Sequence, residues 1–546
     1  MSACEEELNE ERTKKKEKKR TKKKEKLHLA TKEEDDGEEQ KPEVKSSECV
    51  LLHGIFKVGK KSHDVLLTST TLTWTPITPE SPTGEACPPP PGVLMLRDVF
   101  AVKVKRRRAA GQRCGGPVLG VALFYCKRRG RKLEEETLHL HNASSEHTHT
   151  WYNTLRELLA GFSNRPRCVK VFINPSSHKK EAVHIYREHV APLFKMADVR
   201  TDITVTDRRG HALFVMKELQ LDEFDGVVCV GGDGYVAELC HALVLRAQLD
   251  AGSPESPVRA LLPLGIIPAG STDVVSCSVH GVRDPATAAM HVVLGHLQPV
   301  DMCSFFSLGQ LLRYGFSAMF GFGGRSLARA EKRRWMPSSR RHEYALVKTL
   351  ARLSMFVFYR ADHCQLNFLV SNADHDLPGQ LGQDPVQDQG RDSEGAESWT
   401  TIQGSYLSIS IMAIPCLSPH TPRGLAPNTR LANGNAALIA VGDTSRSEFI
   451  KHLKRYNTSG GQFNFSFVET HTVSAVKLRP RPPEDESEED SKTTPIIQSD
   501  ATFPWNIDGE LVEIANEVVI RVHPSLITLY GEDVDEAEAN VSCNCI

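Results

Sequence analysis

The sequence predicts an α/β protein in which a small antiparallel β module comes first, an α/β domain follows, and a β-rich domain comes last. Three observations predict this organisation. The chain has 546 residues, which is too long for one compact domain. Short apolar runs, several with period two, fill residues 48–163, and strand-like and helix-like patterns alternate over residues 166–300. Runs typical of β-strands dominate residues 301–531, apart from two polar stretches at 371–397 and 479–500 that we expect to be disordered insertions.

Residues 1–47 contain almost no large apolar side chains and are predicted to form a disordered tail. A basic run within this tail could serve nuclear import, RNA contact or attraction to anionic lipid. No aromatic residues interleave with the lysines, so base stacking and specific RNA recognition are less favoured. The nuclear-import candidates are Lys14, Lys15, Lys16, Lys18, Lys19, Arg20, Lys22, Lys23 and Lys24.

The β module combines several strand-length apolar runs, such as VLLHGIF (residues 50–56) and LGVALFYC (residues 119–126), with one amphipathic helix that carries Trp151. Many short strands followed by a single helix with a tryptophan resemble a PH domain. That resemblance implies phosphoinositide binding through basic residues of the first hairpin, where Lys57, Lys60 and Lys61 lie. The alternative is that these lysines are simply solvated.

The α/β domain is predicted from three continuous apolar runs, which are typical of buried parallel strands. They are CVKVFIN (residues 168–174), DGVVCV (225–230) and LLPLGII (261–267). A more polar strand is expected over residues 201–205. Helical patterns follow the strands at residues 181–195, 211–220 and 235–249.

Two motifs at the ends of these strands carry the chemistry. In VCVGGDG (residues 228–234), Gly231 and Gly232 let the backbone approach a phosphate without a Cβ in the way. Asp233 would lie at the carboxyl edge of the sheet, where it could hold Mg²⁺ or accept a hydroxyl proton during phosphoryl transfer. IIPAGSTD (residues 266–273) repeats the pattern. Either motif alone could also be an ordinary strand–turn–helix connection.

Together, in this order, the two motifs resemble the diacylglycerol kinase catalytic domain shared by ceramide, sphingosine and diacylglycerol kinases. The resemblance is closest to the ceramide kinases and their like, as in PRGLAP (residues 422–427) and FNFSFVE (residues 463–469). It implies a Rossmann-like nucleotide domain, a β-sandwich lipid-binding domain, and ATP with Mg²⁺ as cofactors. The nucleotide site that it implies comprises Asn174, Thr206, Gly231, Gly232, Asp233, Gly234, Gly270, Ser271, Thr272, Asp508 and Glu510. Within it, Asp233 is the candidate catalytic base, and Asp233 and Asp508 are the candidate Mg²⁺ ligands.

Two departures from the family pattern affect function. Ser177, His178 and Lys180 stand where active relatives have glycines, which obstructs close approach to a phosphate. Arg325 stands on the substrate side, where lipid kinases have an Asp that orients the acceptor hydroxyl, so it supplies only donors. A milder departure is Asn433 in place of an Asp. These changes favour a nucleotide- and lipid-binding protein, in effect a pseudokinase, with weak or absent ceramide phosphorylation and a regulatory or adaptor role. The alternative is an active ATP-dependent kinase for ceramide or another lipid hydroxyl.

The cysteine pattern and the hydropathy of the chain indicate which cofactor sites and which cellular location to expect. The 14 cysteines include no C-x-x-C pair, so the sequence predicts no zinc or haem site and no disulfide framework. No apolar run approaches membrane-spanning length. We expect a cytoplasmic protein, peripheral on endoplasmic reticulum and Golgi membranes, with a nuclear or nucleolar pool. The expected partners are a membrane surface, a sphingolipid or other lipid, and RNA or nuclear-import factors. Cys543 is not favoured as a lipidation site, and oligomeric state is not predicted.

Overall fold

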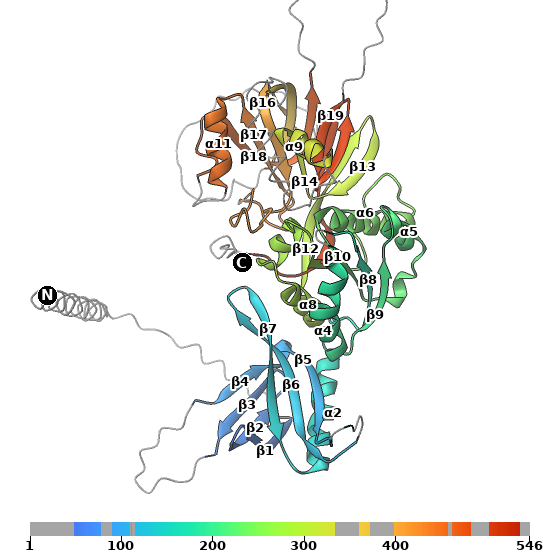
Figure 1. Ribbon diagram of the computed structural model, residues 1–546, viewed down its shortest axis with the longest axis vertical. Coiled ribbons are helices and arrows are strands. Elements are labelled where there is room, and N and C mark those ends of the chain that lie inside the picture. Colours follow the sequence, from blue (N-terminus) through green and yellow to red (C-terminus); the bar gives the residue numbers. More distant parts are fainter. Residues whose placement is uncertain are drawn as a thin grey trace, which may run out of the picture. The chain divides into compact units, whose positions relative to one another are not determined.

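The N-terminal module is a seven-stranded antiparallel sheet with one helix (Figure 1). The computed structural model describes residues 49–77, 90–109, 111, 115–177, 180–332, 360–371, 398–426, 428–456, 461–481 and 502–534. The predicted basic tail, most of both insertions, and residues 535–546 with Cys543 lie outside these ranges. Contacts join the described residues from Val50 onward into one compact unit.

The strands of this module follow the order β4-β3-β2-β1-β7-β6-β5. Helix α2 (Ser145–Ala160) begins where the Ser144 side chain accepts a hydrogen bond from the His147 amide. Its buried Trp151 meets Phe56 edge to face at 4.8 Å, so the helix packs on the apolar face of the sheet. The elements are β1 (Leu52–Val58), β2 (Lys61–Leu67), β3 (Thr71–Pro76), β4 (Gly92–Met95), a 3₁₀ turn (Leu96–Asp98), β5 (Val99–Arg106), β6 (Val118–Arg129) and β7 (Lys132–His141).

The α/β domain has four parallel strands in the order β11-β10-β8-β9. Successive side chains of β10 enter opposite clusters. Cys229 lies on the side of α5 (His211–Glu218) and α6 (Asp233–Asp250), and Val230 lies on the side of α4 (Ala191–Met196) and α8 (Pro285–Leu294). Both faces of the central strands are therefore buried, which explains their continuous apolar runs. The elements are β8 (Cys168–Ile173), β9 (Arg200–Val205), α5 (His211–Glu218), a 3₁₀ turn (Leu221–Glu223), β10 (Gly226–Gly231), α6 (Asp233–Asp250), β11 (Leu264–Pro268), α7 (Val274–His280) and α8 (Pro285–Leu294).

The helix predicted over residues 181–195 is interrupted. It divides into α3 (Ala182–Ile185), a π-helical turn (Tyr186–Val190) and α4 (Ala191–Met196). Pro192 lies in the first turn of α4 and has no amide hydrogen for the preceding turn. The widened turn at Tyr186–Val190 accommodates this missing donor.

The C-terminal domain is β-rich, as the sequence predicts. Its buried side chains form a separate apolar cluster that includes Phe320, Leu366 and Trp505. The elements are β12 (Leu297–Ser307), β13 (Gln310–Gly315), β14 (Ser317–Gly321), α9 (Phe322–Glu331), β15 (Asp362–Val370), β16 (Thr400–Met412), β17 (Ala436–Gly442), α11 (Arg446–Arg455), β18 (Val468–Pro480), β19 (Phe503–Ile507), β20 (Glu510–Ile514) and β21 (Val518–Tyr530). Within the described ranges, no helix is both long and apolar enough to span a bilayer.

Strand β21 joins the two domains. It pairs in parallel with β11 of the α/β domain and antiparallel with β12 and β18 of the β-rich domain. Its last residue, Tyr530, is buried in the apolar cluster around β8 and α8. The strands of both domains therefore form one continuous sheet, and the ends of the parallel strands face groups carried by the β-rich domain.

Candidate nucleotide and substrate site

The carboxyl ends of the four parallel strands bring the two glycine motifs together. Gly232 follows β10 and Gly270 follows β11. A Cβ added to Gly270 would lie 2.5 Å from the Cα of Gly232, which no real side chain tolerates. Glycine is therefore required at these two positions because the turns are in close contact with each other. This requirement is separate from any approach of a phosphate. By contrast, a Cβ on Gly234 would meet nothing closer than 3.8 Å.

Asp233 is partly buried at the start of α6. Its Oδ1 accepts a hydrogen bond from the Val275 amide at 3.1 Å, at the beginning of α7. Burial, together with the nearby negative charge of Asp273, raises the pKa of Asp233 to about 7. A carboxylate with this pKa can take up or release a proton near neutral pH, and a cation bound beside it would stabilise its charged form.

Asp273, which ends the second motif, has a structural role that sequence reasoning missed. Its side chain is buried and its backbone is left-handed, with φ of 55°. Oδ1 accepts from the Gly270 amide at 2.8 Å, and Oδ2 pairs with Nε of Arg283 at 2.7 Å. Arg283 also donates to the Gly270 carbonyl. The acid therefore closes the turn, and only its place at the end of the motif could have drawn attention to it.

The Asp508-Gly509-Glu510 turn joins β19 to β20 and reaches the nucleotide domain, where Glu510 Oε1 pairs with Arg209 at 2.7 Å. Glu510 Oε2 pairs with Arg313 at 2.6 Å. The buried Asp508 carboxylate accepts from the Phe316 amide at 2.9 Å and from the amide and hydroxyl of Ser317 at 2.8 and 3.0 Å.

The carboxylates of Asp233, Asp508 and Glu510 differ in how many protein groups already contact them, which affects their suitability as Mg²⁺ ligands. Protein donors already engage both oxygens of Asp508 and both oxygens of Glu510. A cation at Asp508 would compete with the three hydrogen bonds that hold the β13–β14 corner. Among the residues that the structure describes, Asp233 has no ion-pair partner, and it fits a single Mg²⁺ contact better. Of the two predicted Mg²⁺ ligands, Asp508 is therefore the less accessible one.

In the turn after β8, backbone amides donate hydrogen bonds to acceptors within the turn itself. The Ser176 amide donates to Oδ1 of Asn174 at 3.0 Å, and the Ser177 amide donates to the Asn174 carbonyl at 3.2 Å. The Lys180 amide donates to the Ser177 carbonyl at 2.7 Å, with Lys180 itself at a φ of 66°. Three amides that a glycine-rich turn could direct at a phosphate are thus engaged inside the turn. His178 and Lys179 lie outside the described residues.

The remaining polar residues of the predicted site line the same strand edge. Thr206 follows β9, is buried, and donates its hydroxyl to the Ile173 carbonyl at 3.3 Å. Ser271 and Thr272 are partly exposed after β11, with their hydroxyl oxygens 3.4 Å apart. Of these three, the Ser271 and Thr272 hydroxyls have the better access to a ligand.

Arg325 lies on α9 and is neutralised locally. Its guanidinium pairs with the buried Asp362 and donates to the Arg360 carbonyl at 2.7 Å. Burial lowers the pKa of Arg325, although Asp362 acts in the opposite direction. The sequence predicted a charge reversal on the substrate side but missed the compensating Asp362. The sequence gives little indication of this ion pair because a long segment, residues 333–359, separates Asp362 from α9. That segment lies outside the described ranges.

Two further predicted positions have defined surroundings. Asn433 accepts from the Asn435 amide at 3.3 Å, while Gly434 donates its amide to Asp301 at 2.5 Å. The departure at Asn433 therefore belongs to a tight turn anchored on β12. The phosphoinositide candidates Lys57, Lys60 and Lys61 are all exposed on the β1–β2 hairpin.

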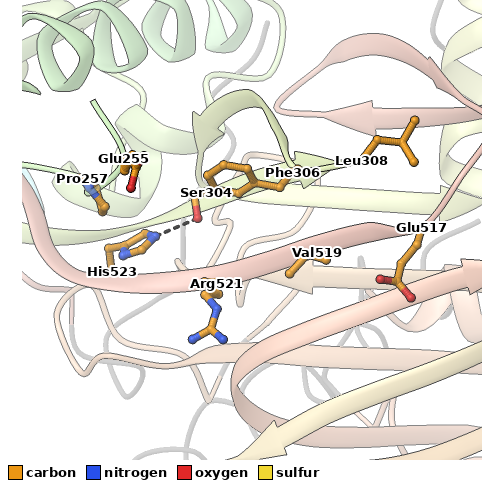
Figure 2. A pocket seen from close by; sticks show the side chains of 10 residues that line it. Glu255, Pro257, Ser304, Phe306, Leu308, Glu517, Val519, Arg521 and His523 are labelled. Atoms are coloured by element: carbon orange, nitrogen blue, oxygen red, sulfur yellow. Dashed lines mark hydrogen bonds between the residues drawn. The ribbon is translucent and has the colours of Figure 1, made fainter. Parts of the chain in front are cut away.

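A separate pocket of about 550 Å³ lies along β12 and β21 (Figure 2). Phe306, Leu308 and Val519 supply its apolar lining, and Ser304 Oγ lies 2.7 Å from Nε2 of His523. No residue predicted for the nucleotide or substrate site lines this pocket.

Comparisons with known proteins show the family that the chain resembles. The chain matches the diacylglycerol kinase catalytic domain over residues 168–305 and the ceramide kinase C-terminal domain over residues 316–546. Human ceramide kinase-like protein is 46% identical over 90% of this chain and 92% of its own length. Human ceramide kinase is 33% identical over 71% of this chain and 78% of its own length. A solved diacylglycerol kinase structure from Bacillus anthracis str. Sterne has 13% identity and a TM-score of 0.40, covering 67% of this chain and 97% of that one.

Proposed function

The chain belongs to the family of ceramide kinases and ceramide kinase-like proteins, with a lipid-kinase catalytic domain, and we propose that it acts as a regulator or adaptor in sphingolipid-related signalling. In this proposal it binds a nucleotide and a lipid, and it phosphorylates ceramide weakly or not at all.

The turn after β8 carries the proposal. Backbone amides that point together into a small concavity bind phosphate well, and glycines permit that arrangement. Here the amides of Ser176, Ser177 and Lys180 donate within the turn, and the Ser177 side chain is buried beneath it. A phosphate would have to compete with these hydrogen bonds, so nucleotide binding should be weak and its phosphates poorly oriented.

The ion pair of Arg325 and Asp362 supports the same conclusion. A kinase needs an acceptor for the hydroxyl proton or a carboxylate that orients the hydroxyl. Asp362 is buried and engaged by both Arg325 and Arg360, the latter at 3.0 Å, so it is not available to a substrate. Removal of one positioning group typically lowers a rate by orders of magnitude.

One observation favours the alternative, an active ATP-dependent lipid kinase. Asp233 lies at the strand edge with its pKa raised to about 7, chiefly by burial, which suits a general base. Bound ATP and Mg²⁺ would supply the phosphoryl group and neutralise its charge. Asp233 would act either as the base or as a ligand of the cation, and the turns at Gly232 and Gly270 would approach the phosphates.

The N-terminal module supports membrane recruitment. We propose that it is a PH-like module, because seven antiparallel strands are followed by a helix whose tryptophan packs on the sheet. Lys57, Lys60 and Lys61 are exposed on one hairpin and could contact an anionic headgroup. Peripheral binding to endoplasmic reticulum and Golgi membranes, and a nuclear or nucleolar pool addressed by the basic tail with RNA or import factors, remain parts of this proposal.

Two measurements on the full chain test the catalytic part. The first is transfer of labelled phosphate from ATP to ceramide, sphingosine and diacylglycerol in micelles with Mg²⁺, and the second is calorimetric ATP binding. We expect little transfer by the unmodified chain. The triple change S177G/H178G/K180G should strengthen ATP binding about ten-fold, since roughly one or two amide contacts would be regained.

The substrate side requires a paired change. R325D alone would place two carboxylates together, so R325D/D362N keeps one acid in the cluster. Combined with the three glycines, it should raise transfer to at least one lipid about ten-fold or more above the unmodified chain. K132G, a glycine change at an exposed position of the β6–β7 hairpin, is the matched control and should alter neither readout. Robust transfer by the unmodified chain to any of these lipids would refute the regulatory proposal.

A further inference from the structure

A cluster of three potential metal ligands lies outside the nucleotide and substrate site. His291 is buried on α8, His296 is in the turn that leads into β12, and Glu532 follows the end of β21. One side-chain atom from each lies within 4.8 Å of the other two. None of these residues has a role in the proposed function. The sequence predicts no zinc site because it contains no C-x-x-C pair. The present cluster has no such local pattern, since Glu532 is far from both histidines along the chain.

The distances match a tetrahedral metal centre. Nδ1 of His291 and Nδ1 of His296 are 3.0 Å apart, and Nδ1 of His296 is 3.3 Å from Oε1 of Glu532. Zinc–nitrogen and zinc–oxygen bonds of about 2.0–2.1 Å at tetrahedral angles place neighbouring ligand atoms about 3.3 Å apart. Two of the three pairs of atoms therefore already have nearly the separation that coordination requires, the third pair lies within 4.8 Å, and a fourth position would be left for water.

Hydrogen bonding alone satisfies this cluster poorly. Nδ1 of His296 carries either one hydrogen or one lone pair, yet it faces both Nδ1 of His291 and the Glu532 carboxylate. With a hydrogen, it cannot point well at both neighbours. With a lone pair, it faces the carboxylate without a donor between them. A divalent cation at the centre would accept lone pairs from all three groups.

The surroundings hold the ligands in place and supply a competitor. His280 stacks on His291 with ring centroids 5.1 Å apart, and its own Nε2 donates to the Tyr530 carbonyl at 3.0 Å. Arg128 of β6 donates to both oxygens of Glu532, at 2.7 and 2.6 Å.

We propose that His291, His296 and Glu532 form a site for a Zn²⁺-type divalent cation. Two imidazoles and one carboxylate are a donor set that suits zinc among the abundant cellular cations. The bound ion ties the residue after β21 to α8 and to the start of β12. It also competes with Arg128 for Glu532, so metal binding weakens the contact between β6 and the C-terminal segment.

Binding is measured on the full chain after removal of metals with a chelator. Titration with Co²⁺, followed by visible absorption, reports tetrahedral coordination, and calorimetry with Zn²⁺ reports affinity and stoichiometry. We expect one tight site, the tetrahedral absorption band, and a rise in melting temperature on addition of Zn²⁺. H296A and E532Q should each weaken Zn²⁺ binding about 100-fold or more and abolish the rise.

Two further variants sharpen the test. H523A removes a half-buried histidine outside the cluster and should leave binding unchanged. R128A removes the competitor for Glu532 and should strengthen Zn²⁺ binding several-fold, a direction that loss of a merely structural ion pair would not give. Circular dichroism confirms that each variant is folded. The proposal is wrong if the folded chain shows no Co²⁺ band and no Zn²⁺ heat, or if H296A and E532Q bind as the unmodified chain does.

Discussion

At the scale of single residues, two acids of the candidate site have opposite roles. Asp273 is buried, paired with Arg283 and bonded to the Gly270 amide, so its charge is used to close a turn. Asp233 accepts a hydrogen bond from the Val275 amide and has no ion-pair partner within the described ranges, so burial makes its charged form costly in free energy. Of the two acids, Asp233 is thus the one that a ligand could engage. The free-energy cost of its buried charge should be measurable.

The raised pKa of Asp233 predicts a pH-dependent stability. An acid whose pKa is higher in the folded state than its ordinary 3.8 holds its proton more tightly after folding. Its contribution is full below pH 3.8 and is lost as the pH rises to about 7. D233N keeps the bond from the Val275 amide but cannot ionise. It should therefore be more stable than the unmodified chain at pH 8, on the order of 2 kcal/mol, with a smaller gain at pH 5.

Urea unfolding of the metal-free chain at the two pH values measures this difference. D222N, which removes an exposed carboxylate from the turn at Leu221–Glu223, gives the baseline for losing one negative charge. An equal gain for D233N at pH 5 and pH 8 would show that the carboxylate is not held at a cost in the folded chain.

Sequence reasoning found some residues of this site and not others, for a physical reason. Gly231, Gly232, Asp233 and Gly270 are visible because strand-turn-helix motifs are local patterns. The ion pairs Asp273–Arg283 and Arg325–Asp362 are not, because the chain folds back to form them and charged residues at these positions have no periodic signal. The use of Asp508 by the β13–β14 corner was hidden for the same reason.

At the scale of elements, the contact between the two glycine turns makes a testable distinction. G270A would put its Cβ 2.5 Å from Gly232 Cα and 2.6 Å from Oδ1 of Asp273. The turns must then separate, and we expect a loss of about 1–3 kcal/mol in the free energy of unfolding. G234A, one residue into α6, has open space around its Cβ and gains helix propensity, so it should be neutral or slightly stabilising.

Chemical denaturation of both variants gives the comparison, and calorimetric ATP binding adds a second readout. If a phosphate approaches the backbone at residue 234, G234A should weaken ATP binding while leaving stability intact. Equal stability of G270A and G234A would contradict the close approach of the two turns.

The sequence predicts strands most accurately where both faces of the strand are buried. The runs at 168–174 and 225–230 correspond to β8 and β10, because strands covered on both faces are apolar at every position. The run at 261–267 was assigned three residues too early, since β11 begins at Leu264. The helix over 181–195 was predicted as continuous, but the missing amide of Pro192 produces a π-helical turn.

At the scale of the whole molecule, β21 determines how the two domains cooperate. Sequence patterns predicted a strand near the C-terminus but not its partners, since pairing between distant strands leaves no local signal. One strand pairs with β11, β12 and β18, and side chains of α6, β13 and β21 share one apolar cluster. Opening of the α/β domain should therefore require disruption of β21.

Tyr530 provides the test of this coupling. It is buried at the end of β21, it lies close to Gly226 of β10 and Gly265 of β11, and its hydroxyl donates to the Asp225 carbonyl at 3.4 Å. Y530A should lower the free energy of unfolding by about 3–5 kcal/mol, because a large side chain is removed where backbone glycines cannot fill the space. Hydrogen exchange should rise in β8, β10 and β11 as well as in β12 and β18.

The matched control is Y406A, which truncates a buried tyrosine on β16 that belongs to the apolar cluster of the β-rich domain. Its exchange should rise mainly in β15, β16 and β17, the strands paired around it. Faster exchange of β8 and β10 in Y530A but not in Y406A is the pattern that a shared strand requires. If Y530A changed exchange only in β12, β18 and β21, the domains would open independently, because the parallel strands would then stay closed without their partner on β21.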